Sequence, residues 1–428
     1  MTIWYVDLGS TYTANVANTG VTSGSPLGGI AGIQRIVSGI AVGGSTFAAG
    51  DTIKVKAGAY NTILNLVKIT TGSGSGLNVG DAVIETTTSG NTPVTGCTGT
   101  IVWVQTAGTS YWVESTGATL WTAGNYIYKV SDGSHAGSIS AITYTGIQPA
   151  IPGNATNGRC KLIGVDVSWN ELALGSYVEF VTNGSTRNDT AINCNALTAN
   201  YWEIRKIKVS ANGSTIAHFY INSYSYVYGC WAYDSNNRGF RTGGNYNIFE
   251  QCLATYNVTG FYLNAYQILI NCNANYSGAD GYLIEGNTSV IGCLSYKNTY
   301  NGMNLDGTNN SVIYNCVINH NTQNGILIAS GTNYTTNYIM GCRITRNGNG
   351  SASYYGINCT ADRQNLENYN VFYANGSGTD HNTLNIVAGA NSSAAGSSTD
   401  EGYTNESSND FNLTSAAILR NTSITLPQ

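Results

Sequence analysis

The sequence predicts an all-β fold, a single-stranded right-handed parallel β-helix in which each turn of the chain forms one rung of a solenoid. Three observations lead to this prediction. A cysteine recurs at intervals of 20 to 26 residues between Cys230 and Cys342. A glycine followed by a large apolar residue recurs at the same period, and short alternating segments lie between polar turns. A period of this length is typical of repeats that bury their apolar faces against one another.

The cysteines form the first column of the predicted stack, because like residues one rung apart lie about 4.8 Å from each other. An aliphatic or aromatic residue stands three positions before each of them, so both columns are expected to face the interior. Buried cysteines act as small hydrophobic side chains, and the narrow geometry of a disulfide disfavours bonds along a strand ladder. We therefore predict free thiols in the column Cys230, Cys252, Cys272, Cys293, Cys316 and Cys342.

A second column is made of asparagines that follow the cysteines by five residues. Its members are Asn257, Asn298, Asn321 and Asn347, and serine fills the equivalent place in two other rungs. Asparagine favours turns, and stacked amides hydrogen-bond to one another along a ladder. The sequence therefore predicts a structural ladder of asparagines at one turn of each rung.

The chain is expected to comprise four parts. Residues 1–61 are predicted to form an N-terminal cap with the first rung, including a short amphipathic helix from Ile30 to Ile40, because an open solenoid end exposes strand edges. Residues 62–145 contain alternating segments at hairpin spacing, which predict an inserted small antiparallel β-barrel-like module; irregular first rungs with long loops are the alternative. Residues 146–385 form the β-helix and residues 386–428 a C-terminal cap.

Both ends of the chain resemble pectate-lyase-like right-handed β-helix proteins. Residues 4–7 and 49–60 are similar to the segments that lead into the first coil in that family, and residues 409–418 are similar to its closing segment. Residues 62–145 resemble, more loosely, a module that is common in tailed-phage structural proteins. The resemblance implies the fold and leaves the activity open.

Charge and composition exclude several classes of partner. Charged residues make up 10% of the chain, the net charge is -5, and no basic stripe is present, so nucleic-acid binding is not expected. No apolar run is long enough for a membrane span and the first residues lack the pattern of a secretory signal, so neither membrane insertion nor secretion is expected. Cysteine pairs at zinc-binding spacing are missing, and no metal or cofactor is expected.

Three carboxylates are candidates for catalysis. Glu285 and Asp306 each lie 13 residues after a cysteine, so successive rungs are expected to stack them, with Asp280 on the preceding turn. A carboxylate pair about 5 Å apart can supply the nucleophile and the acid of a retaining glycosidase. Solvated turn residues are the favoured interpretation, and a bridging cation is a further alternative. Lyase chemistry of the resembling family is not supported, because Arg238 and Arg241 lack a nearby cluster of aspartates.

A mixed aromatic and cationic strip lies four residues after the cysteines. It comprises Asp234, Tyr256, Tyr276, Lys297, His320 and Arg346. Such a strip can hold a glycan by stacking and hydrogen bonds, and it serves equally well as an interface with a second subunit. Both interpretations stay open at the level of the sequence.

The low charge, the free-thiol interior, the missing secretory signal and the phage-like module favour a structural protein of a tailed-phage virion. Such a protein is expected to be a non-catalytic capsid decoration protein or a tail spike or fibre component, assembled in the reducing cytoplasm of the host. The resemblance implies a homotrimer that contacts other virion proteins and surface polysaccharide. A polysaccharide-degrading β-helix enzyme that uses the carboxylate pair is the alternative function, and a glycan-binding adhesin is a third.

Overall fold

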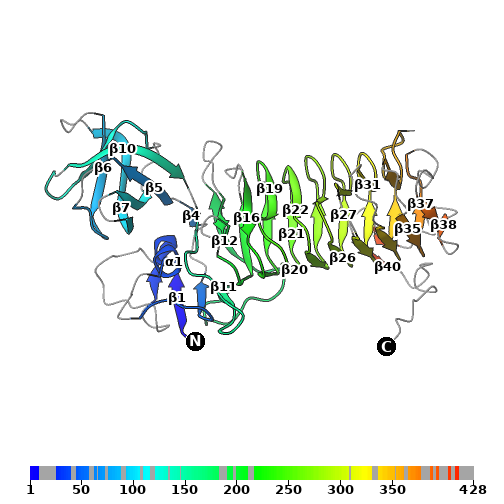
Figure 1. Ribbon diagram of the computed structural model, residues 1–428, viewed down its shortest axis with the longest axis horizontal. Helices are drawn as coiled ribbons and strands as arrows, with labels where there is room; N and C mark the ends of the chain where they lie inside the picture. The colour runs from blue at the N-terminus through cyan, green and yellow to red at the C-terminus, as the bar shows by residue number, and fades with distance from the viewer. Residues whose placement is uncertain are drawn as a thin grey trace. The chain divides into compact units, whose positions relative to one another are not determined.

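The computed structural model describes residues 1–8, 26–39, 45–56, 62–64, 66–72, 76–87, 93–106, 109–115, 121–133, 135–144, 146–182, 190–195, 199–210, 216–307, 310–329, 336–351, 353–360, 365–376, 386–388, 392–394, 403–405 and 410–413. Within them the predicted all-β parallel β-helix is confirmed (Figure 1). The chain separates into unit 1, Met1–Ser225 with Gly229–Trp231, and unit 2, Tyr226–Tyr228 with Ala232–Gln428. No helix in these ranges is long and apolar enough to cross a bilayer.

Unit 1 begins with β1 (Ile3–Asp7), which pairs in parallel with β2 (Leu27–Gly28) and β3 (Thr52–Lys56). The helix α1 (Gly29–Val37) follows β2 and buries Ile33 and Ile36 completely, whereas Ile40 lies outside the described residues. The remaining parallel strands of this unit are β4 (Thr62–Leu64), β11 (Cys160–Val165), β12 (Val178–Thr182), β13 (Ile192–Asn193), β14 (Trp202–Arg205), β15 (Ile207–Ser210) and β16 (Ala217–Ile221).

Unit 1 also contains a closed antiparallel barrel, which agrees with the module predicted for this stretch. Its strands, in the order in which they pair, are β10 (His135–Tyr144), β5 (Leu66–Thr71), β8 (Ser110–Ser115), β7 (Pro93–Thr106), β6 (Ala82–Thr86) and β9 (Tyr126–Lys129). Alternate side chains point inward and form a core that includes Ile101, Tyr111 and Ile127, which have no exposed surface. Closure of the barrel leaves no strand edge open to pair with another chain.

Unit 2 is the regular part of the β-helix, and we number its three parallel sheets by their order along a rung (Figure 1). Sheet 1 contains β17 (Tyr226–Tyr228), β20 (Ile248–Glu250), β23 (Ile268–Ile270), β26 (Ser289–Ile291), β29 (Val312–Tyr314), β32 (Tyr338–Met340), β35 (Asn365–Asn368) and β37 (Ile386–Ala388). Sheet 2 contains β21 (Leu253–Thr255), β24 (Asn273–Asn275), β27 (Leu294–Tyr296), β30 (Val317–Asn319), β33 (Arg343–Thr345), β36 (Val371–Tyr373) and β38 (Ser393–Ala394). Sheet 3 contains β19 (Arg238–Thr242), β22 (Thr259–Leu263), β25 (Tyr282–Ile284), β28 (Met303–Leu305), β31 (Ile326–Ile328) and β34 (Ile357–Cys359).

Two further elements complete the list of strands. Strand β18 (Trp231–Tyr233) begins in unit 1 and ends in unit 2. Near the carboxyl end, β39 (Tyr403–Asn405) and β40 (Asp410–Leu413) form an antiparallel pair. The rest of the closing segment that resembles the β-helix family lies outside the described residues.

From Cys252 to Cys342 the cysteine column lies inside unit 2, between sheets 1 and 2. All ten cysteines of the chain are buried free thiols. The thiol of Cys252 donates to the carbonyl oxygen of Val227 (3.4 Å), and the thiol of Cys316 donates to that of Val290 (3.5 Å), so each bonds to the rung before it. Burial raises the pKa of Cys272 and Cys316 well above the usual thiol value, so these two thiols stay protonated.

Stacked asparagines form a hydrogen-bonded ladder at the turn between sheets 2 and 3. The amide of Asn298 donates to Oδ1 of Asn321 (2.8 Å), and the amide of Asn321 donates to Oδ1 of Asn347 (2.8 Å). The column continues for one more rung, because Asn347 donates to Asn375 in the same way (3.1 Å). At the other end, Asn257 donates to a main-chain carbonyl oxygen of the preceding rung (3.1 Å).

The recurring glycine lies next to this ladder, where no side chain fits. A Cβ on Gly302 would lie 2.5 Å from Cγ2 of Ile318 and 2.7 Å from Nδ2 of Asn321. A Cβ on Gly281 would lie 2.7 Å from Nδ2 of Asn298, one rung earlier. Glycine therefore recurs because it allows the main chain to approach the ladder closely.

Candidate functional site

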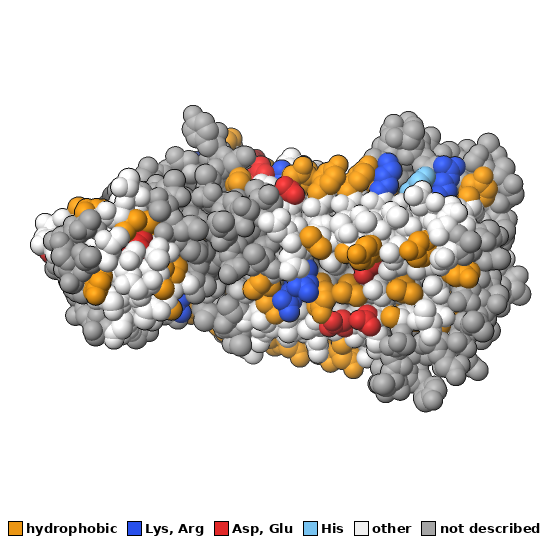
Figure 2. Space-filling model, turned by 90° about the horizontal axis from the view of Figure 1, so that it is seen from above, with side chains coloured by type: hydrophobic (Ala, Val, Ile, Leu, Met, Phe, Trp, Pro, Cys, Tyr) orange, Lys and Arg blue, Asp and Glu red, His pale blue; other side chains and the backbone are white. Residues whose placement is uncertain are grey.

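The outer face of sheet 3 carries a cluster of charged and aromatic side chains, and Figure 2 shows basic and acidic side chains gathered on one exposed face of the protein. Phe240 of β19 is fully buried, as is its partner in β22, so the residues that follow them point outward. These residues are Arg241 and Tyr262, whose Cα atoms are paired across the sheet. Together with Arg238 and Glu285, which contact Tyr262, we call them the sheet 3 cluster.

Tyr262 is the centre of the sheet 3 cluster. Cζ of Arg238 lies 4.2 Å from the centroid of the Tyr262 ring, and Cζ of Arg241 lies 5.6 Å from it. Both distances are in the range of cation–π contacts. The phenolic O–H donates a hydrogen bond to Oε1 of Glu285. Partial burial and the bond to Glu285 raise the pKa of Tyr262, so the phenol stays protonated and acts as a donor.

Glu285 and Asp306 lie in equivalent places on consecutive rungs. Ile284 pairs with Leu305, so the carboxylates that follow these residues stack one rung apart, about 4.8 Å between main chains. The N–H of Asp306 donates to the carbonyl oxygen of Ile284 (2.9 Å), which fixes this register. Both side chains are exposed. Across the described ranges, no three acidic, histidine or cysteine side chains converge as metal ligands would.

Asp280, the third predicted carboxylate, is hydrogen-bonded within the β-helix. Its Oδ1 accepts from the main-chain N–H (3.0 Å) and the amide (2.9 Å) of Asn301, and its Oδ2 accepts from Nδ2 of Asn304 (3.0 Å). Asn324 in turn donates to Oδ1 of Asn301 (3.0 Å), so Asp280 begins a second amide ladder. Asp280 is only 7% exposed and both of its oxygens are occupied, which leaves it a structural role.

The mixed strip lies at the turn between sheets 2 and 3, and we call it the corner strip. All of its members have a left-handed backbone, with φ between 51° and 60°. This conformation is uncommon outside glycine and marks a tight turn, so the strip occupies the outside of one corner of the solenoid. Its members are Asp234, Tyr256, Tyr276, Lys297, His320 and Arg346.

Neighbouring protein groups occupy much of the surroundings of Tyr276 in the corner strip. The rings of Tyr256 and Tyr276 stack with their centroids 5.0 Å apart, and Nζ of Lys297, one rung further on, lies 5.5 Å from the centroid of Tyr276. One face of Tyr276 is therefore covered by Tyr256, and its hydroxyl accepts a hydrogen bond from Nζ of Lys297 (3.4 Å). Nδ1 of His320 is hydrogen-bonded to Oδ1 of the buried Asn319. The corner strip thus suits hydrogen bonding or subunit contact better than sugar stacking.

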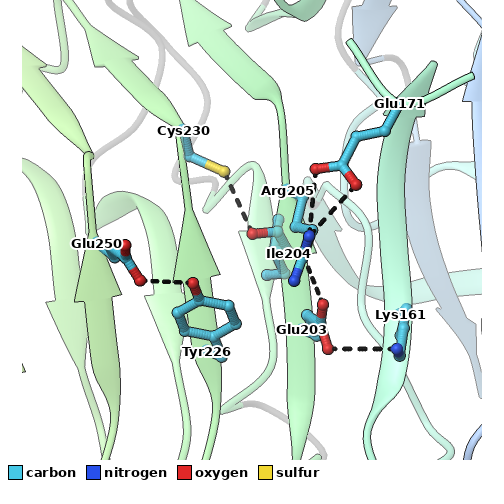
Figure 3. A network of polar contacts seen from close by, with 8 residues as sticks. All are labelled: Lys161, Glu171, Glu203, Ile204, Arg205, Tyr226, Cys230 and Glu250. Carbon is cyan, nitrogen blue, oxygen red and sulfur yellow. Dashed lines mark hydrogen bonds and ion pairs between the residues drawn. The ribbon is translucent and has the colours of Figure 1, made fainter. Parts of the chain in front are cut away.

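A separate polar network lies on unit 1 (Figure 3). Arg205 of β14 forms ion pairs with Glu171 (3.2 Å) and Glu203 (2.5 Å), and Nζ of Lys161 in the neighbouring β11 lies 3.6 Å from Glu203. The thiol of Cys230, the first cysteine of the predicted column, donates to a main-chain carbonyl oxygen of β14 (3.5 Å). Lys161 and Glu203 are paired across neighbouring strands, so we assign this network to the stabilisation of strand register.

Tyr262 is not among the candidates that the sequence predicts, although a signal for it is present. The residue after each buried residue at the start of a sheet 3 strand points outward. The first two residues of this outward-facing column are a charged and an aromatic side chain. Such side chains on an exposed sheet indicate a binding surface. In order, the column reads Arg241, Tyr262, Leu283, Asn304, Leu327 and Asn358.

Comparison with known proteins identifies the fold. No protein-family model matches the chain, and no curated protein matches its sequence. Pectate lyase Pel9A is similar over 95% of this chain and 83% of its own length, with 13% identity and a TM-score of 0.52. A rhamnogalacturonan lyase is similar over 95% of this chain and 91% of its own length, also with 13% identity and a TM-score of 0.52. ORF18 of Geobacillus virus E2 matches 60% of this chain and 53% of its own length, with 13% identity and a TM-score of 0.45.

The two lyases share the pectate-lyase-like parallel β-helix with this chain, as the two ends of the sequence predict. At 13% identity the similarity establishes the fold alone. The function must be argued from the surface of the β-helix.

Proposed function

We propose that this chain is a structural protein of a bacteriophage virion that contacts acidic surface polysaccharide without cleaving it. Its place is that of a capsid decoration protein or a component of a tail spike or fibre. One observation carries the binding role, the convergence of two guanidinium groups on the ring of Tyr262 at the outer face of a sheet. Planar guanidinium groups pair with carboxylates and sulfates through two parallel hydrogen bonds. Strands hold such side chains in a fixed geometry better than loops do.

Composition and internal structure support a place in a virion. The thiols are free, which fits assembly in the host cytoplasm, and few residues are charged. The stretch that resembles tailed-phage modules forms a closed antiparallel barrel. The same proposal includes a homotrimer, contact with other virion proteins, and no contact with nucleic acid or membranes.

An acidic polysaccharide fits the sheet 3 cluster better than a neutral one. The guanidinium groups of Arg238 and Arg241 both lie within about 6 Å of the centroid of the Tyr262 ring, so two positive charges meet at one place on the sheet. Two of the solved structures that share the fold are lyases named for pectate and rhamnogalacturonan. Pectate is therefore a suitable first probe, with dextran sulfate to test sulfate groups and dextran as the neutral polymer.

The double variant Arg238→Ala/Arg241→Ala is expected to bind pectate about tenfold more weakly or worse than the wild type. The reason is that a charge-assisted hydrogen bond contributes about 1.5 to 3 kcal/mol, and about 1.4 kcal/mol corresponds to a factor of ten. Isothermal titration calorimetry at low salt measures the affinity, and thermal melting checks that the variant is folded. The wild type is expected to prefer pectate or dextran sulfate over dextran.

The matched control is Lys297→Ala/Arg346→Ala, which removes the same charge from the corner strip. We expect this variant to bind within about twofold of the wild type, because screened charges away from the ligand contribute little to binding. Loss of binding in the control but not in the arginine variant would place the contact on the corner strip. Equal binding of dextran and pectate would contradict recognition of acidic groups.

A polysaccharide-degrading enzyme is the second candidate function. The specific observation in its favour is the exposed pair Glu285 and Asp306 on consecutive rungs. A main-chain spacing of about 4.8 Å between the rungs is compatible with the separation of about 5 Å between the carboxyl groups of retaining glycosidases. Asp280 takes no part in it, because its oxygens are occupied by Asn301 and Asn304.

Sugar release separates the two functions. We expect the wild type, Glu285→Gln and Asp306→Asn all to give only the background level of reducing ends from pectate and from bacterial surface polysaccharide. Wild-type activity that falls about 100-fold or more in either variant would establish the enzyme and overturn the non-catalytic proposal. Equal activity above background in all three proteins would place catalysis elsewhere in the chain.

A further inference from the structure

The outer face of sheet 1 in unit 2 is apolar along its length. The middle residue of each strand points inward and is buried, so the residues on either side of it point outward. Cα pairing aligns these outward residues in two columns of seven positions between β17 and β35. The first column is Tyr226, Ile248, Ile268, Ser289, Val312, Tyr338 and Leu366, and the second is Tyr228, Glu250, Ile270, Ile291, Tyr314, Met340 and Asn368.

Large side chains of these columns are exposed to an extent that is unusual for a parallel sheet. Ile268 is 39% exposed, Ile291 37%, Tyr338 38% and Leu366 39%. Contiguous apolar patches on a protein surface mark sites of association. The outer face of sheet 1 therefore has the composition of a surface that is covered in the working assembly.

Charge on this face is almost nil. Glu250 is the one charged residue in the two columns, and its carboxylate accepts a hydrogen bond from the phenolic O–H of Tyr226 (2.7 Å; Figure 3). The charged side chains of unit 2 described above lie instead on sheet 3 and the corner strip. A partner for sheet 1 must be equally uncharged, because a charged surface would lose its hydration without gaining a counter-charge.

We infer that the outer face of sheet 1 is the interface between copies of this chain. A partner with the same uncharged, repeating surface is a second copy, whose rows of side chains recur at the same spacing of about 4.8 Å and can interdigitate with it. Tyr246 and Tyr266 extend the face at the start of β20 and β23; their rings stack 5.3 Å apart and are 51% and 44% exposed. The two columns and this pair approach the roughly 20 residues that each partner of a standard interface contributes.

This inference rests on the self-association included in the proposed function, and it names the face that mediates it. The glycan contact on sheet 3 is independent of it. Sheets 1 and 3 are separate sheets, so contact through sheet 1 does not require sheet 3 to be covered.

The test compares two lysine pairs of matched chemistry. Ile268→Lys/Tyr338→Lys places charges on sheet 1, and Leu283→Lys/Leu327→Lys places them on the outer face of sheet 3. Light scattering after gel filtration measures the molar mass over a range of concentrations. The wild type and the sheet 3 variant are expected to be oligomeric. The sheet 1 variant is expected to dissociate at concentrations at least about tenfold higher than those at which the wild type dissociates, since buried unpaired charges are strongly unfavourable.

Three results would count against the inference. A wild type that is monomeric throughout overturns both the self-association and the interface. An oligomer that persists in the sheet 1 variant overturns the interface alone. As a check that needs no variant, hydroxyl-radical labelling of the wild type above and below its dissociation concentration is expected to protect Tyr338 and Tyr266 but not Tyr256. Equal labelling of Tyr338 in both states overturns the assignment.

Discussion

Replacing Asn321 with alanine is expected to lower the free energy of unfolding by about 4 kcal/mol, because each buried hydrogen-bonding group left without a partner costs about 1 to 3 kcal/mol. The Asn321 amide donates to Asn347 (2.8 Å) and to the carbonyl oxygen of Ser295 (3.3 Å). Its Oδ1 accepts from the main-chain N–H (3.1 Å) and the amide (2.8 Å) of Asn298. Asn321 has no exposed surface, so solvent does not replace these bonds.

Urea unfolding followed by circular dichroism measures this loss. The matched control is Thr322→Ala at the next residue, which is exposed and is expected to change stability by less than about 0.5 kcal/mol. An Asn321→Ala variant as stable as the control would mean that the amide ladder does not hold the rungs together.

Replacing Gly302 with alanine is expected to lower the free energy of unfolding by about 3 kcal/mol, the upper end of the usual cost of overpacking a core. The new Cβ would lie 2.5 Å from Cγ2 of Ile318 and 2.7 Å from the carbonyl oxygen of Gly325. The main-chain oxygen belongs to the next rung and is fixed by the sheet, so relief requires the rungs to separate. The same unfolding measurement applies.

Gly278→Ala is the control for the glycine column. Its Cβ would meet no atom closer than 3.7 Å, so we expect a change of less than about 1 kcal/mol, with a small gain from the stiffer unfolded chain. Similar losses in the two alanine variants would show that glycine recurs for a reason other than the closeness of the ladder.

The repeat in the sequence was sufficient to predict the parallel β-helix, because period and stacking are two descriptions of one geometry. A residue that recurs once per rung must lie over its equivalent, as the amides of Asn298, Asn321 and Asn347 do. The barrel could be predicted as well, since alternating segments at hairpin spacing have few other solutions. Both predictions depend on main-chain periodicity, which a sequence displays directly.

The direction of a polar side chain at a turn is harder to predict. Asp280 has the sequence environment of a solvated turn residue, yet it is buried and accepts hydrogen bonds from Asn301 and Asn304. The ladder that it begins follows a visible pattern, because Asp280, Asn301 and Asn324 each directly precede a glycine of the recurring column. That pattern predicts that the three side chains stack on successive rungs. It does not predict their hydrogen-bond partners, which depend on side-chain rotamers.

The function of an apolar column is also hidden in the sequence. Ile268 and Leu269 are adjacent aliphatic residues, but Leu269 has no exposed surface and Ile268 is 39% exposed. Short strands with apolar residues on both faces do not reveal which face is the core. The same limit applies to Tyr262, whose importance comes from Arg238 one rung earlier and Glu285 one rung later.

The surface of unit 2 thus divides by chemistry. Sheet 1 is apolar and nearly uncharged, whereas sheet 3 carries guanidinium, phenol and carboxylate groups. The division matches the proposed function of a virion protein that associates with its copies through one face and meets polysaccharide with another.

Cryo-electron microscopy of the purified phage particle, incubated with an acidic oligosaccharide, is the most direct test of this account. We expect copies of the chain on the particle to contact one another through sheet 1, with the oligosaccharide bound beside Arg238, Arg241 and Tyr262. A particle without the chain, or copies in which sheet 3 is buried and sheet 1 faces solvent, would contradict it.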